Sequence, residues 1–131
     1  MNGETAKELF FSLFDPEGGI KRKLAEGIET TIFVGENVMV SLVKCEPFAK
    51  GEVHAHPQEQ WGVLMEGSGK RFQGGKTIDV EKGNIWQTPG NVQHSFEAGP
   101  HGAYILDIFS PPRDEYRKEG QGFGKQDGPE N

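Results

Sequence analysis

Two histidines, His54 and His56, are separated by a single residue in the segment GEVHAHPQEQ, residues 51–60. On an extended strand, side chains two positions apart project from the same face, with their Cα atoms ~6.5 Å apart. Neutral imidazoles held side by side are typical metal ligands, because a metal accepts both lone pairs. Gln60 follows after a short break and can face the same side if strand pairing resumes there. The segment therefore indicates half of a metal site.

A third histidine, His94, lies in the segment GNIWQTPGNVQHSF, residues 83–96. The Pro-Gly-Asn sequence at 89–91 predicts a turn, after which a strand would carry His94 and Phe96 on one face. Three histidines from two neighbouring strands can hold a metal and leave positions open for water or substrate. The alternative is that all three are ordinary polar residues, and their spacing alone leaves both interpretations open.

A second group of candidate residues lies in ILDIFSPPRDEY, residues 105–116. Asp107 and Phe109 share one face of an apolar strand, and an unpaired buried aspartate costs several kcal/mol, so Asp107 needs a partner or a wet cavity. Prolines end this strand, and Arg113 could then fold back over the mouth of a barrel with a guanidinium suited to a carboxylate. Two interpretations stay open. Asp107 and Arg113 form a structural ion pair, or they act as an acid/base carboxylate and a cation that holds an anionic substrate.

Other residues with chemical side chains are expected to be structural or solvated. Cys45, at a strand end, is expected to be a packed thiol rather than a nucleophile. The remaining residues, expected at the surface, are Lys44, Glu59, Lys70, Arg71 and His101.

The elements that position these residues are short extended segments separated by turn residues. Strands are expected at 20–25, 29–34, 37–45, 51–56, 60–66, 69–73, 77–80, 84–88, 92–97 and 102–109. Many short strands at close spacing predict an all-β sandwich or barrel. We expect one barrel domain at 20–113, preceded by an arm or short helix at 1–19 and followed by a flexible polar tail at 114–131.

Composition limits the partners. The chain has 131 residues, one cysteine, a net charge of −6 and a pI near 5.2. An acidic field repels phosphate backbones, so nucleic acid is not expected as a partner. There is no apolar run of the ~18 residues that a spanning helix needs, and the N-terminus lacks a signal-peptide pattern, so no membrane partner and a cytoplasmic location are expected.

The two histidine segments together resemble the two motifs of the cupin family, G-x5-H-x-H-x3/4-E-x6-G and G-x5-P-x-G-x2-H-x3-N. The matching residues are His54, His56 and Gly67 in the first motif and Gly83, Pro89 and His94 in the second. The departures are Gln60 at the glutamate position, Asn91 for the second glycine, Ala98 for the asparagine, and an unmet first glycine. The resemblance covers roughly residues 37–110 and implies a jelly-roll (double-stranded β-helix) barrel with a bound divalent metal, either Zn, Ni, Mn or Fe.

The order HAHPQEQ, PGNVQHSF and DIFSPPRDEY is similar to small single-domain cupins of the pectin-degradation KdgF type, which convert 4,5-unsaturated uronates to linear ketouronates. That resemblance implies four metal ligands, His54, His56, Gln60 and His94. It also implies Asp107 as the acid/base group, Phe109 as a pocket wall and Arg113 as the holder of the substrate carboxylate.

Three functions remain open at this point. The first is the ring opening of a uronate, for which neutral ligands favour a Lewis-acid metal over a higher oxidation state. The second is a dioxygenase with a three-histidine ferrous site, and the third is a non-enzymatic cupin that binds a small molecule. Small cupins usually pair, so a homodimer is expected, with the Phe-rich segment 9–14 taking part.

Overall fold

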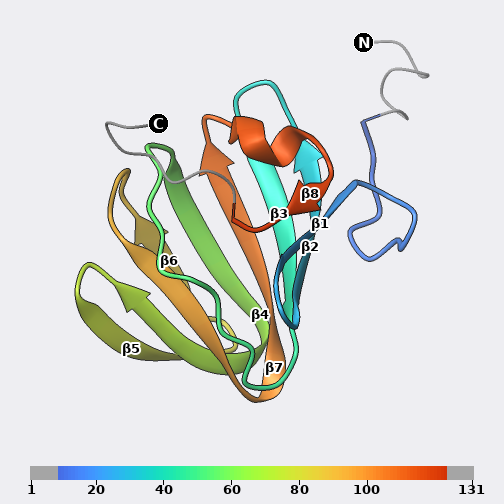
Figure 1. Ribbon diagram of the computed structural model, residues 1–131. Helices are drawn as coiled ribbons and strands as arrows, with labels where there is room; N and C mark the ends of the chain where they lie inside the picture. Colours follow the sequence, from blue (N-terminus) through green and yellow to red (C-terminus); the bar gives the residue numbers. More distant parts are fainter. Residues whose placement is uncertain (1–8, 124–131) are drawn as a thin grey trace.

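The computed structural model describes residues 9–123, which form a curved antiparallel β-structure (Figure 1). Its strands are β1 (Ile20–Ala25), β2 (Ile28–Val34), β3 (Met39–Cys45), β4 (Glu59–Gln73), β5 (Lys76–Glu81), β6 (Ile85–Thr88), β7 (His94–Ser110) and β8 (Gly120–Gln121). One short 3-10 helix, η1 (Asp114–Arg117), precedes β8. The predicted all-β class and jelly-roll barrel are confirmed.

The strands form one sheet in the order β5-β4-β7-β3-β2-β1-β8. Strand β6 pairs with the edge of β4 that faces away from β7. Two long strands, β4 and β7, run antiparallel along most of their length and bend, which curves the sheet (Figure 1). In β2, burial alternates along the β-branched sequence IETTIFV, as expected for a strand with one face on the core. The core residues between the layers include Leu24, Ile28, Ile32, Met39, Leu64, Phe96, Ile105 and Phe109.

Several expected boundaries are wrong. The expected strands 60–66 and 69–73 are one strand, β4, and the expected strands 92–97 and 102–109 are one strand, β7. The glycine-rich segments between them are irregularities inside continuous strands, where the pairing of β4 with β7 shifts register. The expected strand 51–56 is not regular, and it contributes only an isolated bridge between His54 and His94.

Both ends of the described chain differ from the expected short helix and loose tail. Residues 9–14 contain no helix and lie as an arm on the sheet, with Phe11 5.2 Å from Phe33 and Phe14 5.9 Å from Tyr104 between ring centroids. Residues 114–123 are not a loose tail, because η1 and β8 fold back and β8 pairs with β1. The rest of the predicted helix, residues 4–8, and of the tail, residues 124–131, lies outside the described residues.

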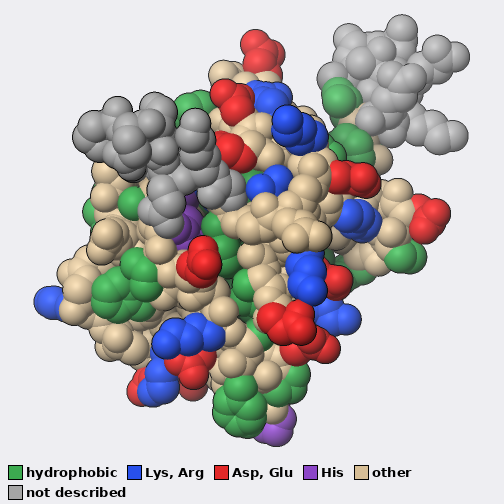
Figure 2. Space-filling view, viewed as in Figure 1, with side chains coloured by type: hydrophobic (Ala, Val, Ile, Leu, Met, Phe, Trp, Pro, Cys, Tyr) green, Lys and Arg blue, Asp and Glu red, His purple; other side chains and the backbone are tan. Residues whose placement is uncertain are grey.

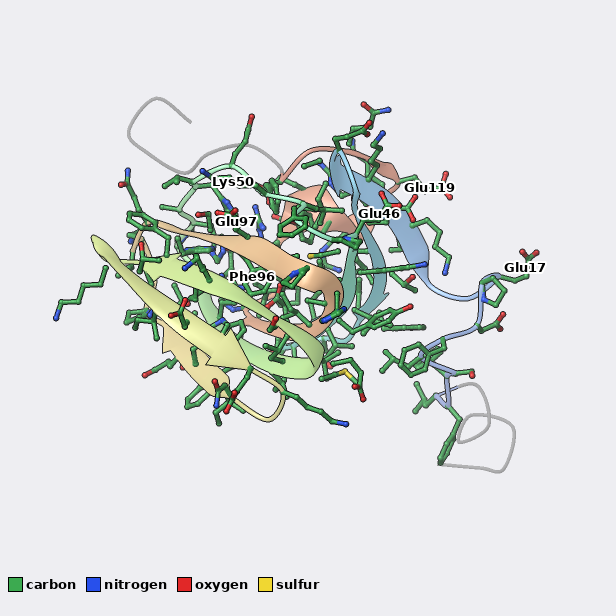
Figure 3. All side chains as sticks on the ribbon, turned by 90° about the horizontal axis from the view of Figure 1, so that it is seen from below. Glu17, Glu46, Lys50, Phe96, Glu97 and Glu119 are labelled. Carbon is green, nitrogen blue, oxygen red and sulfur yellow. The ribbon has the colours of Figure 1, made fainter. Side chains whose placement is uncertain are left out.

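Charged side chains of both signs alternate over the face seen in Figure 2, and no continuous basic area is visible there. The segment between β3 and β4 crosses the barrel beside β7, where Lys50 pairs with Glu97 in an isolated bridge (Figure 3). Among the described residues, no helix has the length and apolar character needed to cross a membrane.

Candidate metal centre

His54 and His94 are held opposite each other by backbone hydrogen bonds. The amide of His54 donates to the carbonyl of His94 at 3.0 Å, and the amide of His94 donates back at 2.9 Å. This reciprocal pair fixes the register between the crossing segment and the start of β7. Both side chains therefore point into the barrel, although the crossing segment is not a regular strand.

The Pro89-Gly90-Asn91 turn brings His56 to the same place. The amide of Asn91 donates to the carbonyl of His56 at 2.7 Å. A Cβ atom at Gly90 would lie 2.3 Å from the carbonyl oxygen of Pro57, so this approach requires glycine. Asn91 has φ 68°, a left-handed conformation that asparagine tolerates better than most residues, which explains how it can replace the second motif glycine.

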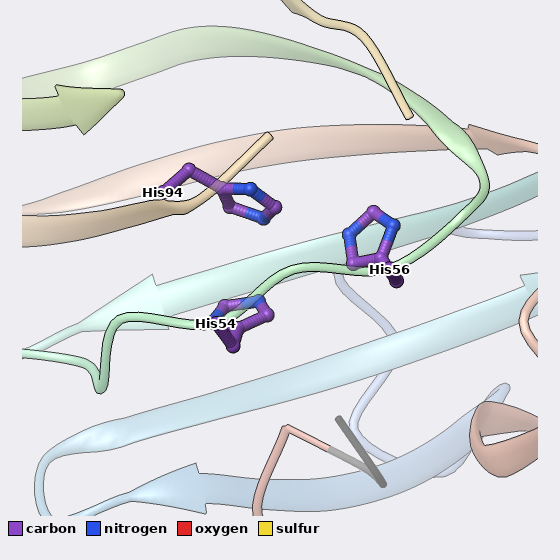
Figure 4. A group of neighbouring side chains, drawn as sticks. All are labelled: His54, His56 and His94. Atoms are coloured by element: carbon purple, nitrogen blue, oxygen red, sulfur yellow. The ribbon is translucent and has the colours of Figure 1, made fainter. Parts of the chain in front are cut away.

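The three imidazole rings converge with their Nε2 atoms inward (Figure 4). Each Nδ1 faces a backbone carbonyl two residues away, at 2.8 Å for His54, 3.1 Å for His56 and 2.8 Å for His94. These contacts favour a proton on Nδ1, which leaves the Nε2 lone pair available to a metal. One ligand-type atom from each ring lies within 4.8 Å of the others, and Nε2 of His94 is buried without a hydrogen-bond partner in the described chain.

Burial keeps these rings neutral. It lowers the pKa of His54 and of His56 to about 4 and that of His94 to about 2. Two nearby arginines add to the effect, Arg113 at His56 and Arg71 at His94. A neutral imidazole is the form that binds a metal, so the donor set fits a divalent ion.

Gln60, at the start of β4, lies beside the cluster. Its Oε1 is 2.9 Å from Nε2 of His56, and the side chain is buried. Two ligands at right angles around a metal with bonds of about 2.1 Å are separated by ~3.0 Å, so this spacing fits two adjacent ligands. Gln60 therefore has the position expected of a fourth neutral ligand.

Asp107, Phe109 and Arg113 line the same cavity as His54 and His94, and the His56 ring lies 5.5 Å from that of Phe109 between centroids. Oδ1 of Asp107 is buried without a hydrogen-bond partner in the described chain, and burial raises the pKa of this carboxyl to about 6. Arg71, the Gln60 side chain and Arg113 oppose this shift. Among residues 9–123 there is no ion pair between Asp107 and Arg113, so the structural ion pair considered from the sequence is absent.

Arg113 is almost fully buried and its guanidinium lies 4.2 Å from the ring centroid of Tyr116 and 5.5 Å from that of Phe109. Its Nη2 donates a short hydrogen bond to the carbonyl of Phe123, and its buried Nε has no partner in the described chain. The side chain therefore folds back over the barrel, as expected, but between aromatic rings and not against a carboxylate.

Two cavity residues were not predicted from the sequence. Arg71, expected to be solvated, is buried and lines the cavity. Phe123, in the expected tail, stacks on His54 with 4.5 Å between ring centroids. With Phe123 in place, the cavity has a volume of about 40 Å³, room for little more than water.

The other expectations hold. Glu59 is exposed and accepts hydrogen bonds from Trp61 and Gln87, and His101 is exposed, although it lies in β7 and not in a turn. Cys45 is a buried free thiol. Lys44 and Lys70 are exposed.

Comparison with known proteins agrees with the fold and the cluster. The Cupin domain family matches residues 41–109, more than half of the chain, and the protein therefore belongs to the cupin family. Oxalate decarboxylase OxdC of Bacillus subtilis (strain 168) is 28% identical over 81 residues, which are 58% of this chain and 21% of OxdC. The chain thus spans about a fifth of that relative's length.

Solved structures share the fold over most of the chain. An RmlC-like cupin from Shewanella frigidimarina NCIMB 400 superposes with a TM-score of 0.71 at 22% identity, covering 82% of this chain and 96% of that one. KdgF from Halomonas sp. superposes with a TM-score of 0.70 at 24% identity, covering 80% and 97%. A B. subtilis oxalate decarboxylase with Mn(II) centres superposes with a TM-score of 0.67 at 24% identity, covering 77% and 29%.

Proposed function

We propose that this cupin is a metal-dependent enzyme that opens the ring of a small anionic sugar acid, a 4,5-unsaturated uronate, to give a linear ketouronate. The observation that carries the proposal is a cluster of three neutral histidines, two of which line one cavity with a buried carboxyl of raised pKa and a buried arginine without a carboxylate partner. The similarity to the Halomonas KdgF structure over nearly its whole length supports the same choice.

In this proposal His54, His56, His94 and Gln60 hold one divalent metal. When bound, it would supply Lewis-acid polarisation of substrate oxygens. The four ligands are neutral, which favours this role over redox chemistry. The identity of the metal, among Zn, Ni, Mn and Fe, is decided by elemental analysis.

Arg113 would hold the substrate carboxylate through its guanidinium, whose Nε has no partner in the described chain, and Phe109 would form the apolar wall beside the ring. Asp107 would take a proton from the substrate at one atom and return it at another as the ring opens. Substrate and product are at the same oxidation level, so no oxidant is needed. A carboxyl pKa near 6 suits both steps close to neutral pH.

The test is turnover of a 4,5-unsaturated uronate, followed by loss of the ultraviolet absorbance of its double bond. Asp107→Asn is expected to lose at least ~100-fold in rate with its metal content unchanged. Asp79→Asn, a change of the same kind in an exposed pair with Lys70, is the control and should keep full activity. Full activity of Asp107→Asn would remove the assignment, and turnover that requires air would favour a dioxygenase.

A further inference from the structure

The cavity contains more positive charge than the proposed reaction uses. Arg71 and Arg113 both line it and are buried, with 5% and 1% of their surfaces exposed. In the described part of the chain, neither guanidinium lies within ion-pair distance of a carboxylate. The second arginine therefore needs an explanation of its own.

Arg71 is held in place by neutral groups only. Its Nη2 donates to the hydroxyl of Thr88 at 2.9 Å and its Nε to Oε1 of Gln73 at 3.3 Å. Thr88 in turn donates to Gln73 at 2.6 Å, and the guanidinium lies 5.3 Å from the ring centroid of Trp86. These contacts orient the guanidinium, and the negative charge that acts on it is the Asp107 carboxylate, which is not within ion-pair distance.

The charge balance favours an anionic ligand. Even with Asp107 ionised, two arginines face one carboxylate in the lining of this cavity. A buried charge without a counter-ion destabilises the folded protein, and an anion bound in the cavity would offset this cost. A divalent metal would increase this excess, so a ligand with a single negative charge would leave part of it uncompensated.

We propose that Arg71 is a second anion-binding residue of this cavity, and that the ligand carries oxygen anions at two ends, one at Arg113 and one at Arg71. The proposal rests on the proposed function in one respect, that Arg113 holds the first carboxylate. For a uronate, the second anion is the oxygen on which negative charge develops as Asp107 takes up the proton. A small dicarboxylate carries the same charge pattern permanently.

Succinate and butyrate form a matched pair of probes, because both have four carbons and only succinate has the second carboxylate. Calorimetric titration of the zinc-loaded protein should show tighter binding of succinate. Arg71→Met should weaken succinate binding tenfold or more and change butyrate binding less than twofold. Lys70→Met removes the same charge from the neighbouring exposed position, where Lys70 pairs with Asp79, and should leave both affinities unchanged.

Equal affinities of wild type and Arg71→Met for succinate would overturn the proposal. An equal loss of affinity for succinate and butyrate would also overturn it, because Arg71 would then act only through the general electrostatic field of the cavity. If Arg71→Met does not fold, Thr88→Val, which removes the oxygen that orients Nη2, should weaken succinate binding selectively. No selective loss in that variant would equally count against Arg71.

The two proposals fail in different ways. A selective loss of succinate binding without any turnover of uronates would remove the ring-opening reaction and keep the role of Arg71. Full uronate turnover with unchanged succinate binding in Arg71→Met would keep the reaction and remove that role.

Discussion

The three histidines of the metal centre are neutral because they are buried, and this has a consequence for the metal-free protein. The pKa of a histidine in an unfolded chain is about 6.5, and burial lowers that of His54 to about 4. Below pH 6.5 the unfolded chain therefore binds more protons than the folded one. The contribution of these histidines to the free energy of unfolding is therefore largest above pH 6.5, and it falls as the pH drops toward 4.

We predict that metal-free protein loses stability between pH 7 and pH 5. For His54 alone the shift corresponds to roughly 3 kcal/mol when complete. Asp107 acts in the opposite direction, because its raised pKa of about 6 favours the folded state at low pH, but one carboxyl opposes three histidines. Urea unfolding at both pH values measures the difference, with the exposed His101→Gln as a control that keeps it. Equal stability at the two pH values would contradict the burial effect.

Which residues could be predicted depends on how local their placement is. His54, His56 and His94 could be found from sequence, because one turn and one pair of backbone hydrogen bonds bring them together. Asp107 and Phe109 follow from the alternation of a single strand. Gln60 could be placed for the same reason, since it lies only four residues beyond His56.

Strand irregularities explain why the inward position of Arg71 was missed. Counting alternate residues from Gln60 puts even-numbered residues of β4 inside, as Leu64 is, and would place Arg71 outside. The register of β4 against β7 shifts between Leu64 and Glu66 and again between Gly67 and Gly69, so beyond these points odd-numbered residues face inward. Alternation along a sequence does not predict such a shift.

Gly67, at this irregularity, is predicted to be essential for stability. It has φ 88°, and a Cβ atom there would lie 2.0 Å from the carbonyl oxygen of Gly102. Gly67→Ala should therefore cost roughly 3 kcal/mol or more from backbone strain and overpacking together. Gly83→Ala is the matched control, because φ is 93° but no atom lies within 4 Å, so only the backbone strain remains. Equal losses in thermal unfolding would show that the close approach is unimportant.

On the scale of the whole molecule, the arm at 9–14 leaves apolar side chains on the surface. Phe10 is 81% exposed and Phe11, Phe14 and Leu9 are also exposed in the single chain. Exposed apolar groups of this kind are typical of an interface. We therefore keep the prediction of a homodimer formed through this arm.

Light scattering is expected to give twice the chain mass. Phe10→Ser should shift the equilibrium toward the monomer without changing the metal content. Lys76→Ser, a change at an exposed position of β5, which lies at the opposite end of the strand order from β1 and β8, is the control. A monomeric wild type at all concentrations would contradict this assignment.

The C-terminal segment is tied to the barrel by Arg22. This buried side chain donates to the carbonyls of Glu115, Gln121 and Gly122 at 3.0, 2.8 and 2.7 Å. Phe123 follows directly and packs on Gly51, where an added Cβ atom would meet its ring at 2.8 Å. The segment could not be predicted from its polar sequence, because its order comes from contacts with β1, about 100 residues earlier in the chain.

The stacking of Phe123 on His54 affects how long a bound metal or ligand remains in the cavity. A cavity of about 40 Å³ is too small for a sugar acid while the ring is in place, and we predict that Phe123 leaves His54 when a ligand or metal enters or leaves. Phe123→Ala should speed the removal of metal by a chelator several-fold, whereas Phe48→Ala, at an exposed position, should not. Unchanged release would mean that exchange follows another path. If release is faster, the segment that ends in Phe123 determines how long a metal or ligand remains inside, independently of how tightly it is bound.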